Sequence, residues 1–242
     1  MSCSVNHMLD RLALSFDLQR QFAGNAAHEL RTPLAMMQTK LELFTEEHSD
    51  VDAETSKLVQ FQIDQVDRLT SLVRTLLEMS NLQSVSRSDE IELAPLIDEI
   101  LTDLTTLAEQ KNITLHQNCE DVHMIGSDTL IYRLLFNLIE NAIKYNHSGG
   151  SVTVSMQQEN QQVLLHIADT GCGIPEEYRE SIFQPFFRVD KSRSRQMGGV
   201  GLGLALVREI AVLHGGSVCV ESGSKDGTTF AVKLPLNGEK TE

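Results

Sequence analysis

The sequence predicts a two-part fold, an antiparallel helical hairpin that forms a dimeric four-helix bundle, followed by an α/β sandwich. Three observations lead to this expectation. Apolar residues recur at seven-residue intervals through most of residues 5–79. The polar stretch 84–90 then interrupts this period. Beyond it, helical and alternating β-prone segments are mixed, which indicates one sheet with helices on one face.

The hairpin is predicted from two apolar rows in residues 5–44. Rows offset by three and four positions form the a/d seam of a bundle helix. Residues 45–55 are acidic and lose the period, so they are expected to form a loop, and a second helix is expected from about Ser56 to Met79. A lone hairpin leaves an apolar stripe uncovered, so we expect a second copy of the chain to cover it. The two rows are Leu9, Phe16, Ala23, Leu30, Met37 and Phe44, and Ala13, Ala27, Leu34 and Leu41.

The second part is predicted to alternate between helices and strands. Its helices are expected at about 95–110, 127–145 and 202–214, with Ser127 or Asp128 as the cap of the middle one. A long irregular stretch, 170–198, precedes the last helix. The predicted β segments are ITLHQN, a short VHMI, the hairpin of SVTVSMQ and QQVLLHIAD, and the final pair SVCVES and TTFAVKL.

Composition excludes several classes of protein. The formal net charge of −14, from 34 acidic and 20 basic residues, argues against a general nucleic-acid surface or an anionic-membrane surface. The four cysteines form no CxxC pair, which argues against a zinc site or a disulfide framework and fits a reducing cytosol. No run of eighteen apolar residues is present, so the chain as given is expected to be soluble.

The predicted helix 127–145 carries the first candidate site. Asn137 and Asn141 are four residues apart and so share one helix face. Two amide oxygens on one face suit Mg²⁺ carrying nucleotide phosphates. Lys144 could attract phosphate and Tyr145 could cover a base. Ordinary surface asparagines are the competing interpretation.

Two glycine-rich turns form the second and third candidates. Asp169 ends a β segment just before Gly171 and Gly173, where a carboxylate could accept a hydrogen bond from the exocyclic amine of adenine. Free amides at a helix N-terminus beside a glycine loop form a phosphate site. Plain turns would explain either motif by itself. The glycine loop contains Gly199, Gly201, Leu202 and Gly203.

The stretch between these turns combines aromatic and basic residues. Phe183, Phe186 and Phe187 would anchor a flexible lid that places cations over a polyphosphate. A solvated loop is the alternative. The fourth cluster is residues 227–230, Gly-Thr-Thr-Phe. Its Thr228 is expected to contact the base, although a turn explains its neighbour Gly227 equally well. The cations are Arg188, Lys191, Arg193 and Arg195.

Together these motifs are more specific than any one of them. Their order over about 70 residues resembles the ATP-binding domain of histidine kinases and their relatives, the gyrase, Hsp90 and MutL superfamily (GHKL or Bergerat type). The stretch HELRTPL, residues 28–34, lies about 110 residues upstream. With it, the chain resembles a sensor histidine kinase of two-component systems from about Leu9 to Leu236.

The resemblance implies roles for the second part. ATP would be bound with Mg²⁺ and phosphates on Asn137 and Asn141, with Lys144 near the phosphates and Tyr145 near the base. Asp169 would bind the adenine amine, in a pocket shaped by Gly171 and Gly173. The hinge of the lid, with its arginines Arg188 and Arg193, would be formed by Gly199, Gly201 and Gly203, with Leu202 beside the nucleotide and Thr228 at the base.

It also implies that His28 is the phosphoacceptor. His28 falls just outside the predicted seam of Ala27 and Leu30, where a second domain can reach it. Glu29 is placed to accept a proton from one ring nitrogen, which leaves the other nucleophilic. Thr32 would align water for dephosphorylation of the partner. A lone surface histidine usually has no function, and the case for His28 as phosphoacceptor depends on its neighbours.

The resemblance further implies an organisation, a partner and a location. Phosphate would pass from His28 to an aspartate of a response regulator, in a homodimer. The chain is expected to be the cytoplasmic part of a bacterial membrane sensor, with membrane contact only through segments outside it. The expected parts are 1–15 as the remnant of a signalling helix, 16–83 for dimerisation and phosphotransfer, 84–90 as linker, 91–236 as catalytic ATP-binding domain and 237–242 as tail.

Two other functions stay open at this point. A non-catalytic dimeric signalling scaffold would keep the fold without binding ATP. A GHKL-type ATPase would release phosphate without a phosphoprotein intermediate. The glutamate that activates water in the gyrase branch is replaced here by Asn137, which favours transfer to a side chain over hydrolysis.

Overall fold

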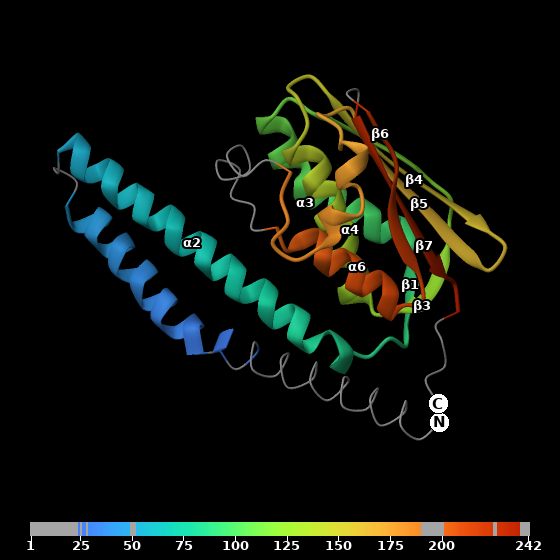
Figure 1. The fold of residues 1–242 in the computed structure, drawn as a ribbon, viewed down its shortest axis with the longest axis horizontal. Helices are drawn as coiled ribbons and strands as arrows, with labels where there is room; N and C mark the ends of the chain where they lie inside the picture. The colour runs from blue at the N-terminus through green and yellow to red at the C-terminus, as the bar shows by residue number, and fades with distance from the viewer. Residues whose placement is uncertain are drawn as a thin grey trace. The chain divides into compact units, whose positions relative to one another are not determined.

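The chain folds into two compact units that divide between Gln83 and Ser84 (Figure 1). The computed structural model describes residues 24, 26–27, 29–48, 52–189, 201–224 and 227–237. Each unit is considered by itself below.

The first unit is a helical hairpin. Residues 29–47 are helical, and the second helix, α2, spans Ala53–Asn81. It begins where it does because the Asp52 carboxylate accepts hydrogen bonds from the backbone N–H groups of Glu54 and Thr55, each at 2.9 Å. The expected loop at 45–55 is therefore too long, since helix occupies both of its ends.

The two apolar rows of the hairpin have different environments. Ala27 and Leu34, at 2% and 7% exposure, pack in one cluster with Val66, Val73 and Leu77 of α2. Leu30, from the other row, is 51% exposed. Ala27 thus faces the seam inside one chain as expected, whereas Leu30 points away from it.

The second unit contains the mixed α/β elements. Its strands are β1 (Asp89–Glu92), β2 (Thr114–Cys119), β3 (His123–Gly126), β4 (Ser151–Glu159), β5 (Gln162–Asp169), β6 (Ser217–Ser224) and β7 (Gly227–Pro235). Its helices are α3 (Leu93–Gln110), α4 (Asp128–Lys144) and α6 (Gly203–Leu213), with 3₁₀ turns η2 (Glu176–Tyr178) and η3 (Ser181–Phe183). A further 3₁₀ turn, η1 (Leu82–Ser84), follows α2.

The expected sandwich is present, with one addition. Five strands form a sheet in the order β2-β4-β5-β7-β6, and α3, α4 and α6 lie over one of its faces (Figure 1). Strands β1 and β3 pair with each other in a separate two-stranded sheet, so the expectation of one sheet was wrong. Strand β1 begins at Asp89, inside the stretch 84–90 that was expected to be a linker. Three of its four residues, DEIE, are acidic, and the single apolar residue Ile91 gave no β signal by itself.

The core of this unit lies between the large sheet and the helices. Three alternate residues of β4 and three of β5 are buried there, including Val154 and Leu165 at 0% exposure. Helix α4 buries eight side chains on the facing side. Burial of this apolar surface holds α4 against the sheet. It therefore determines which polar face of the helix points away from the sheet.

A buried histidine links the ends of two helices in this core. His214, which follows α6, accepts a hydrogen bond from the backbone N–H of Ser127 at Nε2, at 3.1 Å. Its Nδ1 donates to the carbonyl oxygen of Ile210 at 2.8 Å. Ser127 directly precedes α4, so the ring joins the start of α4 to the end of α6.

Within the described ranges, no helix combines the length and apolar character that crossing a membrane demands.

Candidate functional site

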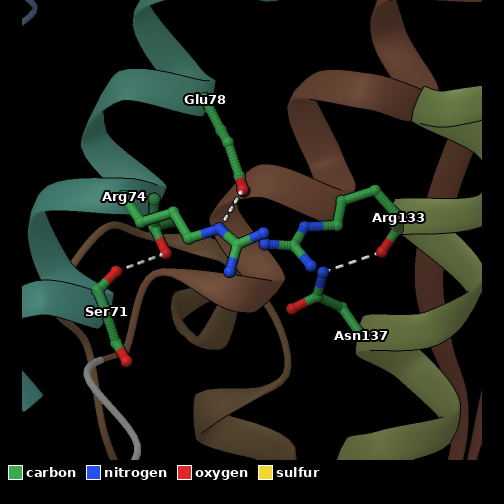
Figure 2. A network of polar contacts seen from close by, with 6 residues as sticks. Ser71, Arg74, Glu78, Arg133 and Asn137 are labelled. Carbon is green, nitrogen blue, oxygen red and sulfur yellow. Dashed lines mark hydrogen bonds and ion pairs between the residues drawn. The ribbon is translucent and has the colours of Figure 1, made fainter. Parts of the chain in front are cut away.

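Helix α4 carries the two predicted asparagines, four residues apart on one face. The side-chain Nδ2 of Asn137 donates to the carbonyl oxygen of Arg133 at 2.7 Å (Figure 2). This bond turns Oδ1 away, and a Cβ added at Gly203 would lie 2.7 Å from it. The Asn137 amide oxygen therefore faces the first residue of α6. Asn141 makes no side-chain hydrogen bond to any described residue, which leaves its oxygen available.

The loop before α6 brings the glycine motif against the aromatic segment. Gly201 has a φ of 78°, and a Cβ there would lie 2.9 Å from the carbonyl oxygen of Phe187. The N–H of Phe186 donates to the carbonyl oxygen of Gly201 at 2.8 Å. Leu202 is buried and Gly203 opens the helix, so free backbone amides point out of its N-terminus. Gly199 and Arg193 lie outside the described residues.

Asp169, the last residue of β5, is held by two backbone amides. Its Oδ1 accepts from the N–H of Gly171 at 2.7 Å and from the N–H of Thr228 at 3.3 Å. Burial raises the pKa of the Asp169 carboxyl, and the two hydrogen bonds lower it in part. Oδ2 has no hydrogen-bond partner among the described residues and can accept a bond from an exocyclic amine.

Close backbone approaches around Asp169 require glycine. A Cβ at Gly171 would lie 2.5 Å from the carbonyl oxygen of Tyr145 and 2.8 Å from Asp169 Oδ1. Gly227 has a φ of 131°, and a Cβ there would overlap the carbonyl group of Asp169. Gly173 also has a positive φ, 69°. Gly227 is thus more than a turn residue, because β7 can start beside Asp169 only without a side chain at this position.

Lys144 and Tyr145 lie at the C-terminal end of α4, beside this loop. The carbonyl oxygen of Tyr145 accepts from the N–H of Cys172 at 3.4 Å. The Lys144 ammonium lies 2.9 Å from the Glu140 carboxylate, and its carbonyl oxygen accepts from Lys111 Nζ at 2.6 Å. In this structure the charge of Lys144 is therefore directed to Glu140, one turn back on the helix.

The aromatic anchor is formed by two of the three expected phenylalanines. Phe183 is buried and meets Phe230 of β7 edge-on, with ring centroids 6.3 Å apart. Phe187 packs with Tyr178 at 5.8 Å. Phe186 is 58% exposed and has a φ of 65°, so its inclusion in the anchor was wrong. Its backbone is turned into the left-handed region by the crossing with Gly201. Arg188 follows Phe187 directly in the chain.

The first unit carries the remaining predicted residues. Glu29 and Thr32 are exposed on the helix of residues 29–47, which continues through Pro33. His28 lies outside the described residues. In the second helix of this unit, the guanidinium of Arg74 pairs with the carboxylate of Glu78 at 3.4 Å (Figure 2).

Sequence reasoning missed Asn146 and Thr170. Asn146 follows α4 and Thr170 stands between Asp169 and Gly171, and their side chains are hydrogen-bonded at 3.1 Å. The threonine inside D-T-G was a visible signal. Its importance depends on a partner 24 residues away, which the motif does not reveal.

The arrangement in the second unit fits an adenine nucleotide with Mg²⁺. Asp169 Oδ2 can accept from the base amine, the amides at the start of α6 can bind phosphate, and amide oxygens suit a hard cation. Among the described residues, no group of three His, Cys, Asp or Glu side chains forms an alternative metal site.

Comparisons with known proteins agree with this arrangement. Residues 126–238 match the family described as histidine kinase-, DNA gyrase B-, and HSP90-like ATPase. Residues 18–85 match the His Kinase A (phospho-acceptor) domain.

Similar proteins cover both units. Sensor histidine kinase RppB of Synechocystis is 36% identical over 228 residues, which is 92% of this chain and 50% of RppB. Signal transduction histidine-protein kinase ArlS of Staphylococcus aureus is 35% identical over 237 residues, 95% of this chain and 51% of ArlS. The chain thus spans about half the length of these curated relatives.

A solved structure is similar over nearly the whole chain. The histidine kinase ThkA, in complex with the response regulator protein TrrA, has 25% sequence identity and a TM-score of 0.65. The similarity covers 96% of this chain and 64% of ThkA.

Proposed function

Because this chain belongs to the sensor histidine kinases, we propose that it is an ATP-dependent kinase core that phosphorylates its own His28 and passes the phosphoryl group to a response-regulator aspartate. The observation that carries the proposal is the position of Asn137 in the second unit, where its Oδ1 faces Gly203 at the start of α6. An amide oxygen beside free helix amides is an arrangement for phosphates and their cation.

The second unit would bind ATP through its own residues. Asp169 would accept the adenine amine through Oδ2, and Thr228 and Gly171 hold the carboxylate in place for this. Gly227 and Gly171 leave space for the base. Asn137 and Asn141 would hold Mg²⁺, which would neutralise charge on the phosphates. Gly201, Leu202 and Gly203 would meet the phosphates, together with Gly199, Arg188 and Arg193.

The first unit would supply the nucleophile. Glu29 would accept a proton from one ring nitrogen of His28, so that the other nitrogen attacks the γ-phosphorus and ADP leaves. The exposed position of Glu29 on the helix supports this role, because the domain that carries ATP must reach its neighbour His28. Thr32, one turn further along, would align water when the enzyme dephosphorylates its partner.

A homodimer is part of this proposal. Leu30, Met37, Leu58, Phe61 and Leu69 of the hairpin are each at least 47% exposed. Two such hairpins can bury these side chains against each other in a four-helix bundle. The family of residues 18–85 and the apolar row left uncovered in one chain support this assembly.

The proposed partner is a response regulator, and the proposed location is the cytoplasmic side of a membrane. ThkA, to which the chain is similar, is seen in complex with such a regulator, which supports the partner. RppB, which is named a sensor kinase, is about twice as long as the matched region, so half of its length lies outside the similarity and is available for a sensing part.

The proposal is tested by incubating the chain with Mg²⁺ and [γ-³²P]ATP. We expect label on the protein that is stable in base and labile in acid, and none on His28→Gln. His48→Gln is the matched control, since His48 lies in the same unit beyond the helix of residues 29–47 and should leave labelling intact. Label that survives His28→Gln, or phosphate release without a phosphoprotein, would contradict the proposal.

A further inference from the structure

We propose that Thr170 and Asn146 are positioning residues that orient the Asp169 carboxylate toward the base of the bound nucleotide. The inference rests on the proposed function, because it takes Asp169 as the acceptor of the adenine amine. It assigns a task to two side chains that do not themselves touch the nucleotide.

The Thr170 hydroxyl joins two segments that are distant in the sequence. It donates to Asn146 Oδ1 at 3.1 Å and accepts from the backbone N–H of Ser151 at 2.9 Å. The backbone N–H of Thr170 also donates to the carbonyl oxygen of Ser151, at 3.2 Å. Thr170 is therefore tied both to Asn146, two residues beyond the end of α4, and to the first residue of β4.

Both polar atoms of the Asn146 side chain are hydrogen-bonded. Its Nδ2 donates to the carbonyl oxygen of Ser151 at 2.9 Å, and its Oδ1 also accepts from the N–H of His147 at 2.9 Å. A Cβ at Gly150 would overlap Asn146 Oδ1 and lie 2.6 Å from the Thr170 hydroxyl. The backbone closes over this pair so tightly that only glycine fits, which leaves the two side chains little freedom.

This network controls the backbone that holds Asp169. The residue after Thr170 is Gly171, whose N–H donates the shorter of the two hydrogen bonds to Asp169 Oδ1, 2.7 Å against 3.3 Å from Thr228. On the far side, the N–H of Cys172 reaches Tyr145 at a long 3.4 Å. Without the Thr170 hydroxyl, the position of the Gly171 amide is weakly fixed, and the carboxylate can rotate away from the base.

A positioning role predicts a loss of base discrimination beyond any loss of stability. Inosine triphosphate carries a carbonyl oxygen where ATP carries the exocyclic amine, so it cannot donate to Asp169. A site with a correctly oriented Asp169 carboxylate rejects inosine triphosphate, because the carboxylate and the carbonyl oxygen of the base are both hydrogen-bond acceptors. A loosened but folded site would bind the two nucleotides more equally.

The experiment measures Kd for ATP and for inosine triphosphate by calorimetry on the full chain, with Mg²⁺ present. Thr170→Val removes the hydroxyl at nearly constant shape, and Thr170→Ser keeps it. Thr105→Val is the matched control, because the exposed Thr105 hydroxyl on α3 donates only to the carbonyl oxygen of Leu101. If Thr170→Val does not fold, Asn146→Ala replaces it, and thermal unfolding is followed for every variant.

We expect the wild type to prefer ATP by about tenfold or more, as for a hydrogen bond to a charged group. Thr170→Val should reduce this preference to about twofold, while Thr170→Ser and Thr105→Val keep it. A full preference in folded Thr170→Val would overturn the positioning role and leave the proposed function standing. A wild type without preference for ATP would instead overturn the proposed role of Asp169.

Discussion

Asp169 shows how one carboxylate is prepared for a ligand. It is half-buried, and burial raises the pKa of its carboxyl, against the two amides that lower it. Since a raised pKa means that the folded state holds the proton more tightly than the unfolded chain, ionised Asp169 opposes folding at neutral pH. The proposed role of Asp169 in binding would therefore come at some expense of stability.

The first prediction at this scale concerns pH. Protonated Asp169 no longer offers an ionised acceptor, and its raised pKa places this change at higher pH than for an ordinary aspartate. The affinity for ATP should therefore fall as the pH is lowered toward the acid range. Calorimetric titrations at a series of pH values measure this dependence.

Asp169→Asn is the matched variant. It keeps an oxygen for the Gly171 and Thr228 amides but removes the charge, so the affinity for ATP at pH 7 should fall by about tenfold or more. Its thermal unfolding temperature at pH 7 should equal or exceed that of the wild type, because no buried charge remains. A variant that unfolds at lower temperature and binds ATP normally would contradict both parts.

At the scale of elements, His214 fastens the end of α6 to the start of α4. Burial lowers the pKa of its imidazole, the donation to the Ile210 carbonyl raises it, and the charge of Arg87 lowers it. The neutral ring is required, since only an unprotonated Nε2 can accept from Ser127. Helices α4 and α6, which carry Asn137, Asn141 and Gly203, thus share one neutral histidine.

This link makes the stability of the second unit depend on pH. A histidine with a depressed folded pKa contributes stability that is fully present above its unfolded value, about 6.5, and lost as the pH falls through that range. His214→Ala should lower the unfolding free energy at pH 7.5 by about 1–3 kcal/mol, because the Ser127 amide loses its buried acceptor.

Urea unfolding at pH 7.5 and pH 5.5 checks the prediction, with the exposed His116 of β2 replaced by alanine as the control. The difference between wild type and His214→Ala should shrink at the lower pH, whereas His116→Ala should behave as the wild type. An equal difference at both pH values would show that titration of His214 is irrelevant to folding.

At the scale of the whole molecule, the hairpin presents one apolar row inward and one outward. We predict that Leu69→Glu, which puts a charge into the outward row, shifts the chain from dimer to monomer. Ser71→Glu adds the same charge on a polar row of α2 and should leave the dimer intact. Sedimentation equilibrium measures the mass, and an unchanged mass for Leu69→Glu would contradict the proposed interface.

The fold class, the helices and the motifs of the candidate site could be predicted from the amino-acid sequence. Apolar periodicity shows which residues are buried, so α2, α3, α4 and α6 were predictable to within a few residues, whereas the start of the predicted first helix lies outside the described residues. The D-T-G-C-G and G-V-G-L-G turns were visible because only glycine permits such close backbone approaches. Their nearness to each other, however, was an expectation taken from a resemblance.

Tertiary structure alone decided how distant residues meet. It brought Thr228 and Gly227 against Asp169, joined Thr170 to Asn146, and directed Lys144 to Glu140. It also paired β1 with β3 and left Phe186 exposed. These contacts depend on backbone register and on which face of an element is buried, and both are set by packing across the whole unit rather than by the local pattern of residues.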